Sequence, residues 1–232
     1  MKKGHSISIV IPAYNEEENV RLVLKDSIKK LPKYFKNWEI ILVDDGSRDK
    51  TARIAKQVAE KHNEVTVLQM DKNVGFSRAM LAGIKKSTKE FVAYMPADGQ
   101  FLVDDMRHCF EVLDDADLIL GYRGGRTDYA TKRIFFSYRY LLLLLMLFDV
   151  KYMDVGWVNI WRTNAVKRVR LEALGGIFIL TEILVKFRKK RLRIVEAPSY
   201  YHPRISGEVK NAKWNVVFAT FSNAFKLWWQ LR

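Results

Sequence analysis

The chain has 232 residues, of which 49% are apolar, and Lys and Arg outnumber Asp and Glu by 40 to 26, giving a net charge of +14. This length and composition exclude a disordered chain and fit one large domain with an appended subregion. The charge indicates anionic partners such as phosphates, nucleic acid or acidic lipid headgroups, although a lysine-rich soluble surface is the alternative.

The single Cys109 excludes an internal disulfide and a cysteine-based metal cluster. The N-terminus has no signal-peptide pattern, so we expect a cytoplasmic protein.

Five short apolar runs rich in β-branched residues predict strands that are buried on both faces. They are residues 6–11, 39–43, 65–68, 91–95 and 117–120. Segments of helical period lie between them, at residues 17–31, 51–62, 77–87 and 104–113. This alternation predicts an α/β fold with a mostly parallel central sheet flanked by helices.

The pattern changes after Gly121, and we place a soft boundary near residue 122. A long basic and aromatic helical stretch comes first, followed by an apolar run at residues 157–161, a helix near Glu182 and another apolar run at residues 192–196.

Two apolar segments of this second half could meet a membrane. Residues 141–148 are eight apolar residues, far fewer than the roughly 20 that span a bilayer. They follow basic and aromatic residues, so they fit either a helix in the membrane interface or a core helix. The C-terminal segment carries an aromatic stripe at helical spacing with Lys and Arg nearby, and we favour interfacial contact over core packing there. The stripe consists of Trp214, Phe218, Phe221, Phe225 and Trp228, with Trp229 beside it.

Polar side chains follow the first two predicted strands, and the ligand crevice of an open α/β sheet lies at the carboxyl ends of its strands. Tyr14 and Glu16 follow the first strand, and an aromatic face with an acceptor suits a nucleoside. The second strand ends in Val-Asp-Asp-Gly-Ser at residues 43–47. One of these acids can accept from a base N–H or a ribose hydroxyl, and Asp49 is the expected N-cap of the next helix.

The fourth strand leads into Asp98-Gly99-Gln100 and the fifth into Gly121-Tyr122-Arg123. Asp-Gly alone is common in solvated turns. Polar groups after four strands at one edge are not explained by turns, so we expect Asp98 to reach a metal or a sugar.

These segments resemble the family 2 glycosyltransferases of GT-A fold, and within them the polyprenyl-phosphate sugar synthases typified by dolichyl-phosphate mannose or glucose synthases. The resemblance covers about residues 6–212, and the Val-Asp-Asp-Gly-Ser block carries the superfamily. The narrower branch depends on later signals, which are Gly121-Tyr122-Arg123, Arg133 with Ser137, Asp154 with Gly156-Trp157, Glu182 and residues 204–210.

The resemblance implies a set of site residues. The nucleoside would contact Pro12, Tyr14, Glu16, Val43 and Asp45. The diphosphate would lie near Ala97, Asp98 and Gln100, with Mg²⁺ or Mn²⁺ held by Asp98 and Gln100, and Arg123, Arg204 and Lys210 would meet phosphates. The acceptor phosphate would be oriented by Arg133 and Ser137, and Glu182 is a further catalytic candidate.

The implied reaction is inverting transfer of a hexose from a GDP-mannose or UDP-glucose type donor to a polyprenyl or dolichyl phosphate. Residues 1–122 would bind the nucleotide sugar, residues 123–212 would form the acceptor side, and residues 213–232 would be an amphipathic helix. The protein would be peripheral at the cytoplasmic face of the membrane and would have no nucleic-acid partner.

Three departures from the family pattern are visible. Pro96 stands where the family commonly has the first Asp of Asp-x-Asp, so the metal would depend on Asp98, Gln100 and substrate phosphates. Val209 removes a hydroxyl from the Gly-Glu-Ser-Lys run but leaves Lys210. Many relatives continue into transmembrane helices, so this chain would hold the membrane peripherally or use a separate membrane-protein partner.

Other readings are weaker. The same fold could act on a soluble saccharide or protein, although the Gln-x-x-Arg-Trp string of processive synthases does not occur. A non-enzymatic binder of anionic surfaces would not explain acids at the strand ends. A dinucleotide oxidoreductase would need Gly-x-Gly-x-x-Gly after the first strand, which this sequence lacks.

Overall fold

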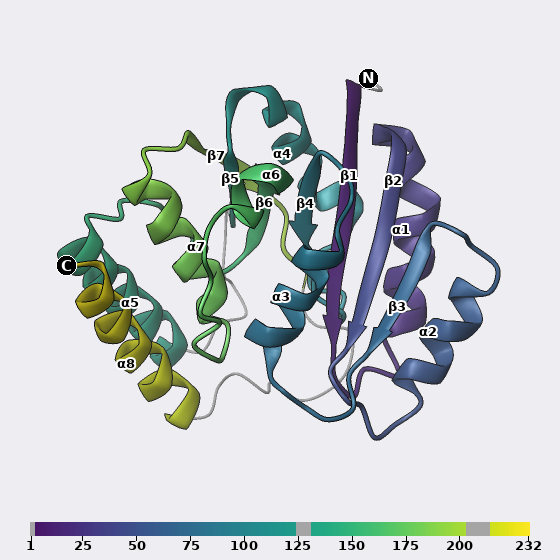
Figure 1. The fold of residues 1–232 in the computed structure, drawn as a ribbon, viewed down its shortest axis with the longest axis horizontal. Coiled ribbons are helices and arrows are strands. Elements are labelled where there is room, and N and C mark those ends of the chain that lie inside the picture. Colours follow the sequence, from purple (N-terminus) through teal and green to yellow (C-terminus); the bar gives the residue numbers. More distant parts are fainter. Residues whose placement is uncertain (1–2, 124–130, 203–213) are drawn as a thin grey trace.

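The computed structural model describes residues 3–123, 131–202 and 214–232, and it leaves aside the side chains of residues 3, 131–136 and 214–218. The described residues form a seven-stranded sheet in the order β3-β2-β1-β4-β6-β5-β7 (Figure 1). All its strand pairs are parallel except those of β6, which runs antiparallel to both β4 and β5. The strands are β1 (Lys3–Ala13), β2 (Phe35–Asp44), β3 (Val65–Gln69), β4 (Phe91–Tyr94), β5 (Leu118–Arg123), β6 (Val158–Arg162) and β7 (Ile194–Ser199).

Helices cover both faces of this sheet, as the predicted α/β fold requires. One face carries α1 (Val20–Tyr34), α2 (Thr51–Ala59), η1 (Val103–Met106), α4 (Arg107–Glu111) and η2 (Leu113–Asp115). The other carries α3 (Phe76–Lys86), α5 (Thr131–Phe148), α6 (Thr163–Lys167), α7 (Phe178–Lys189) and α8 (Trp214–Leu231). The helices α5 and α8 lie side by side at the edge of the molecule farthest from α2 (Figure 1).

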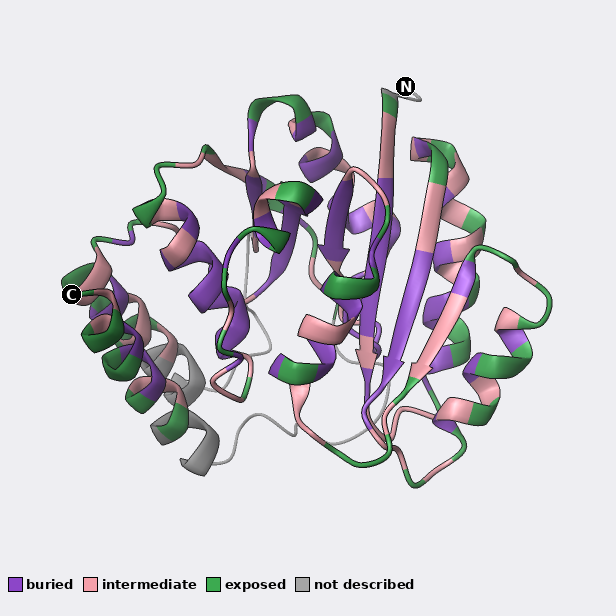
Figure 2. Ribbon diagram, viewed as in Figure 1, coloured by how far each residue is buried: buried purple, intermediate pink, exposed green. Residues whose placement is uncertain are grey.

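The alternation of side chains along β1 explains why two cores form. Ile7, Ile9 and Ile11 belong to the core under α1, whereas Val10 belongs to the core under α3 and α7. All four are fully buried, because successive strand residues point to opposite faces of a sheet that is covered on both sides (Figure 2). The strand sequences are therefore nearly continuous apolar runs and do not alternate regularly between apolar and polar residues.

The predicted helix over residues 104–113 is wrong in its continuity, because η1, α4 and η2 replace it. The carbonyl of Asp105 accepts from the amide of Tyr200 (3.3 Å), and the Asp105 carboxylate accepts from the amide of Leu102 (2.8 Å). The segment after β7 thus donates a hydrogen bond to a carbonyl that, in a continuous helix, would accept from an amide of the same helix.

The two apolar segments of the second half are helices with one buried and one exposed face. In α5, Leu143 and Leu144 are buried, while Leu142 and Met146 are exposed. In α8, Ala224 and Leu227 are buried, and Phe225 and Trp229 are exposed, whereas Trp228 is half-buried. Both helices therefore contribute to the core and also present apolar side chains to solvent. Across the described residues, no helix combines the length and the hydropathy needed to cross a membrane.

Candidate active site at the carboxyl ends of the strands

The loops that follow β1 and β2 are joined by hydrogen bonds. The amides of Asn15, Glu16 and Glu17 donate to Ser47 Oγ (3.0 Å), Thr51 Oγ1 (2.8 Å) and Asp49 Oδ2 (3.1 Å). In return, the amides of Arg48 and Lys50 donate to Asn15 Oδ1 (2.9 Å) and Glu17 Oε2 (3.0 Å). These five hydrogen bonds hold the two loops together, so the loops form one wall at this edge of the sheet.

Asp49 is not the N-cap of α2, as the sequence had suggested. Lys50 occupies that position and makes no side-chain capping bond. The Asp49 carboxylate instead accepts from the amides of Thr51 (2.9 Å) and Glu17 (3.1 Å). It satisfies the first turn of α2 and ties that turn to the β1 loop at the same time.

A cavity of about 290 Å³ opens between this wall and the segment after β3. Tyr14 lines it, together with Gly46, Ser47, Arg48 and residues 69–73. Pro12 and Val43 are register partners in the strands that lead to it, and Glu16 lies in the β1 loop, where its carboxylate accepts from Asn19 Nδ2 (2.9 Å). The cavity has an aromatic wall and several backbone groups, which suits the base or ribose of a nucleoside.

Asp45 holds the segment that follows β3. Its two oxygens accept from the amides of Val74 (2.8 Å) and Gly75 (2.9 Å), just before α3 begins. Burial raises the pKa of Asp45; the two amide bonds oppose that shift and the Asp44 carboxylate adds to it. The expected contact of Asp45 with a base stays a prediction, and in this structure Asp45 holds the 74–75 backbone, which directly follows the lining residues 69–73. Its neighbour Asp44 is fully buried, and Oδ1 of Asp44 has no hydrogen-bond partner among the described residues.

The turn after β4 lies beside the end of β1, because β1 and β4 are paired in parallel. Asp98 Oδ1 accepts from the amide of Gln100 (3.1 Å), and Gly99 has a φ of 72°. That backbone conformation favours glycine, which explains the Asp-Gly-Gln order. Pro96 and Ala97 are buried beneath the turn.

The donor chemistry of this turn fits a divalent cation. Asp98 supplies a carboxylate and Gln100 an amide oxygen from adjacent positions, and hard oxygen ligands of this kind suit Mg²⁺ or Mn²⁺. The described residues contain no group of three or more His, Cys, Asp or Glu that could hold a metal. A metal at Asp98 and Gln100 would therefore complete its shell with water and substrate phosphates.

The segment after β7 closes over this turn. The amide of His202 donates to the carbonyl of Gln100 (2.9 Å), and Gln100 Nε2 lies 3.5 Å from the hydroxyl of Tyr201. The Tyr201 ring packs against Trp157, with ring centroids 5.4 Å apart, and Trp157 packs against Phe101 at 4.6 Å. This aromatic row was not expected from the sequence, since its members come from three distant segments.

Arg123 at the end of β5 makes a buried ion pair. Its Nε and Nη2 donate to the two oxygens of Asp154 at 2.6 and 3.1 Å, with side-chain exposures of 8% and 5%. The guanidinium carbon also lies 4.5 Å from the centre of the Trp157 ring. Asp154 and Trp157, which carry part of the family resemblance, thus fix the position of Arg123.

Glu182 lies on α7 with no exposed surface. Its oxygens accept from the amides of Glu172 (2.6 Å) and Ala173 (3.1 Å), and Lys186 Nζ lies 2.6 Å from Oε1. These contacts favour a role in positioning the 172–173 backbone, and the catalytic role of Glu182 stays a prediction.

The loop between α6 and α7 links this glutamate to the donor side. Ser77 at the start of α3 donates to the carbonyl of Gly176 (2.7 Å), and Asn223 of α8 donates to the carbonyl of Leu174 (2.9 Å). Asp45 holds the residues just before α3, so a series of hydrogen bonds connects α8, the loop, α3 and the segment that follows β3. Single-sequence reasoning missed both residues, because a buried Ser or Asn carries no motif.

The remaining predicted site residues lie on α5 or outside the described residues. Ser137 is a half-buried residue of α5, and Arg133 belongs to the same helix, but its side chain is not described. Arg204 and Lys210 lie outside the described residues. Their phosphate contacts stay predictions.

Comparison with known proteins identifies relatives of this chain. The chain is 31% identical to the dodecaprenyl-phosphate galacturonate synthase of Rhizobium johnstonii over 71% of its own length and 50% of the relative's. It is 28% identical to the dolichol-phosphate mannosyltransferase of Pyrococcus furiosus over 95% of its own length and 63% of the relative's. The chain thus spans about half the length of the curated relatives that it matches.

Solved structures show the same fold at low identity. The glucosyl-3-phosphoglycerate synthase of Mycobacterium tuberculosis, in complex with Mn²⁺, UDP and phosphoglyceric acid, superposes with a TM-score of 0.76 at 14% identity, over 97% of this chain and 79% of that one. A mannosyltransferase from Pyrobaculum calidifontis, in complex with GDP-Man and Mn²⁺, gives 0.68 at 15% identity, over 97% and 65%. These likenesses confirm the GT-A architecture. The sequence profile of Glycosyl transferase family 2 matches residues 8–169, which is most of the chain and includes the β1, β2 and β4 loops, and the chain therefore belongs to that family.

Proposed function

We propose that this glycosyltransferase moves a hexose from a nucleotide sugar to the phosphate of a polyprenol, with inversion at the anomeric carbon. The observation that carries the proposal is the length of chain over which one relative, a dolichol-phosphate mannosyltransferase, is similar. The family profile ends at residue 169, whereas the similarity to a dolichol-phosphate mannosyltransferase covers 95% of the chain and so extends over residues 123–212, the half proposed to bind the acceptor.

The proposed donor site combines the cavity at Tyr14 with the turn at Asp98. The nucleoside would lie against Tyr14, and the diphosphate would extend along the β1 end toward Asp98 and Gln100, which follow β4, the strand next to β1 in the sheet. Mg²⁺ or Mn²⁺ at Asp98 and Gln100 would neutralise charge on the leaving nucleoside diphosphate. Related structures crystallised with Mn²⁺ or Mg²⁺ and a nucleotide support this choice of cofactor.

The proposed acceptor is already ionised at neutral pH, so the chain has no need of a strong general base. The protein then acts by positioning the two substrates and by balancing charge. Arg123 would supply positive charge from a fixed position, since Asp154 and Trp157 hold its guanidinium. Arg133 and Ser137 would orient the acceptor phosphate, and Arg204 and Lys210 would contact phosphates.

We place the protein at the cytoplasmic face of a membrane, held peripherally or with a separate membrane-protein partner. The exposed apolar side chains of α5 and α8, among them Met146 at 68% and Trp229 at 73% exposure, support contact with a membrane surface. Amphipathic helices with aromatic side chains on one face bind membrane interfaces in this manner.

The proposal is tested by following radiolabel from GDP-mannose, UDP-glucose and UDP-N-acetylglucosamine into a polyprenyl phosphate, with Mg²⁺, Mn²⁺ or EDTA present. We expect metal-dependent label in the lipid phase from one of these donors. Donor hydrolysis or binding without a lipid product would instead favour a soluble saccharide or protein acceptor. The absence of any donor binding would contradict the proposed activity.

Replacement of Asp98 tests the proposed metal site. We expect Asp98→Ala to lower transfer by about a thousandfold or more, because metal stabilisation of developing charge is worth several kcal/mol. Titration calorimetry should show, in parallel, that Mn²⁺ no longer strengthens binding of the nucleoside diphosphate. The matched control is Asp115→Ala, an exposed acid of η2, which should leave both readouts unchanged. Transfer by Asp98→Ala within about threefold of the parent would contradict the assignment.

A further inference from the structure

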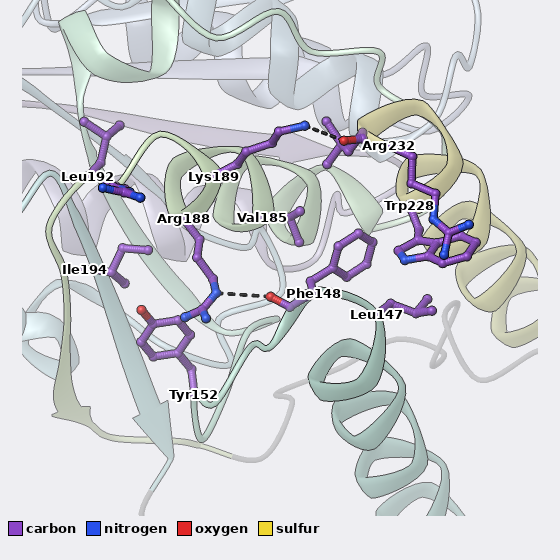
Figure 3. A pocket seen from close by; sticks show the side chains of 12 residues that line it. Leu147, Phe148, Tyr152, Val185, Arg188, Lys189, Leu192, Ile194, Trp228 and Arg232 are labelled. Atoms are coloured by element: carbon purple, nitrogen blue, oxygen red, sulfur yellow. Dashed lines mark hydrogen bonds between the residues drawn. The ribbon is translucent and has the colours of Figure 1, made fainter.

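A second cavity, of about 650 Å³, lies where the C-terminal ends of α5, α7 and α8 meet the start of β7 (Figure 3). Its walls are mostly apolar and include Phe148, Val185, Ile194 and Trp228. Four cationic side chains also line it, and the described lining residues include no acid; the cations are Arg188, Lys189, Arg191 and Arg232.

This cavity is at the opposite end of the sheet from the candidate active site. Ile194, which lines it, is the first residue of β7, whereas Tyr201 and His202, which follow β7, contact Gln100. The six residues of β7 alone span roughly 17 Å at the usual rise per residue. A phosphate bound in the cavity could therefore not be the one that receives the sugar.

Two of the four cations serve the fold. Arg188 Nε donates to the carbonyl of Phe148 (3.1 Å), and Arg188 also pairs with Asp149. Lys189 Nζ donates to the carbonyl of Leu231. These side chains therefore satisfy the C-terminal ends of α5 and α8, where helix carbonyls are left without partners.

The other two cations are placed differently. The Arg191 side chain is exposed and has no hydrogen bond or ion pair with the described part of the chain. Arg232 stacks on Trp228, with its guanidinium carbon 3.6 Å from the ring centre. Both can donate several hydrogen bonds to phosphate oxygens without losing an acidic partner.

The surface next to the cavity is apolar. On α8, Phe225 and Trp229 are 51% and 73% exposed, and Trp228 lies between this exposed face and the cavity. On α5, Met146 is exposed two residues before Phe148. Cations beside exposed aromatic and aliphatic side chains match a ligand that has a phosphate on one end and hydrocarbon on the other.

We propose that this cavity binds the phosphate headgroup of an anionic bilayer phospholipid, through Arg191 and Arg232, while Trp228 and Trp229 contact its first methylenes. The protein would then contact the membrane at two separate places, the transfer site and this second site. The proposal is independent of which sugar is transferred.

The test is binding to vesicles of phosphatidylcholine with or without phosphatidylglycerol, measured by flotation at low and at physiological salt. The test variant is Arg191→Gln with Arg232→Gln. The control is Lys36→Gln with Lys61→Gln, which removes the same two charges from exposed sites far from the cavity. We expect the test variant to lose binding to the anionic vesicles by about tenfold or more, and the control by less than about twofold. All four residues are exposed or half-buried, and thermal melting verifies that each variant is folded.

Three results would overturn the proposal. An equal loss in both variants would mean non-specific attraction by the net charge. Saturable binding of inorganic phosphate that competes with the vesicles would indicate a soluble anion. Selective loss of binding to polyprenyl phosphate in neutral vesicles would indicate the acceptor.

Sugar transfer to a short water-soluble prenyl phosphate is measured on the same variants and should stay within about twofold of the parent, since the cavity lies away from the transfer site. That readout separates a failure of the lipid site from a failure of the proposed enzyme activity.

Discussion

Gly46 and Asp45 are neighbouring residues that contact the backbone of the segment after β3, at the cavity proposed to bind the donor. Asp45 fixes the amides of Val74 and Gly75, and this brings residues 72–73 against Gly46. A Cβ atom at Gly46 would lie 2.5 Å from the carbonyl carbon of Lys72 and 2.6 Å from the nitrogen of Asn73. The glycine is needed for this approach and for its φ of 69°.

Gly46→Ala should therefore weaken both folding and donor binding. We expect a loss of about 1–3 kcal/mol in the free energy of unfolding, because backbone atoms cannot move aside as a flexible side chain can. Nucleoside diphosphate affinity, measured by calorimetry, should fall at the same time. Gly175→Ala is the control, since Gly175 also has a positive φ but nothing lies within 4 Å of its Cβ position. Equal effects of the two changes on nucleotide affinity would show that the clash at Gly46 does not matter.

The sequence predicted some features of the candidate site at the level of single residues but not others. The turn at Asp98 was expected because Asp-Gly-Gln after a strand is a local pattern. The ion pair of Arg123 with Asp154 was not expected, since it joins residues 31 positions apart. A single sequence carries no information on which of several acids will meet a given arginine.

At the scale of elements, α7 supports the 171–177 loop through Glu182. The loop contains three residues with positive φ, Ala173, Gly175 and Gly176, and Glu182 holds the amide of Ala173. A non-glycine residue in that conformation needs such support from its surroundings.

Glu182→Gln distinguishes a positioning role from direct catalysis. The single oxygen of an amide cannot replace both carboxylate oxygens, so one of the two backbone bonds is lost, and Lys186 loses the negative charge of its buried partner. We therefore expect a loss of about 3 kcal/mol in stability. Any fall in kcat should then be modest, with the pH profile of transfer unchanged. A thousandfold fall in kcat with unaltered urea unfolding would instead identify Glu182 as a catalytic residue.

Asp104 connects η1 to α1. Its carboxylate accepts from the hydroxyl of Tyr34 (2.9 Å) and pairs with Lys30 Nζ at 3.1 Å. Burial alone would raise the pKa of Asp104, but the hydrogen bonds from Lys30 and Tyr34 outweigh it and lower the pKa below its ordinary 3.8. The ionised form is therefore favoured in the folded state, and its stabilisation is present above the unfolded pKa and lost as the pH falls through the folded one.

Asp104→Asn should accordingly destabilise the protein at pH 7 and much less near pH 3. The Asp104 side chain is 34% exposed, so solvent screening limits the expected loss to about 0.5–1 kcal/mol. Urea unfolding of parent and variant at both pH values measures it. Asp115→Asn, an exposed acid of η2, is the control. A difference that grew on acidification would contradict the assigned sign.

At the scale of the whole molecule, two cores lie on opposite faces of one sheet. Cys109 belongs to the first core, on the face that carries α1, so its reactivity can be used to measure the opening of that core. Its side chain lies on α4, fully buried in the first core, and burial raises the pKa of the thiol to about 12. At pH 8 only about one molecule in ten thousand would carry the reactive thiolate.

Cys109 should therefore react with a thiol reagent such as Ellman's reagent only when the core opens. We expect labelling at pH 8 to be slow in buffer and complete within seconds in strong denaturant, with a native rate that follows the free energy of unfolding. Ser222→Cys in a Cys109→Ala background supplies the exposed control on α8. Rapid labelling of native Cys109 would show that the first core opens locally.

The α/β class, the first five strands and the polar strand ends were determined by the sequence itself. Apolar periodicity, β-branched runs and Asp-Gly turns depend on neighbouring residues, so they can be read without knowing the path of the chain. The family resemblance drew on the same local blocks, and the profile match at residues 8–169 confirms the family.

Only the tertiary structure decided how these elements meet. It inserts β6 antiparallel between β4 and β5, which brings Asp154 and Trp157 to Arg123. It also assigns the oxygens of Asp45 to the 74–75 amides, and it gathers the C-terminal ends of α5, α7 and α8 around a cationic cavity. These arrangements depend on chain reversals and on contacts between residues 29 or more positions apart, and the free energy of such contacts is set by packing rather than by local preference.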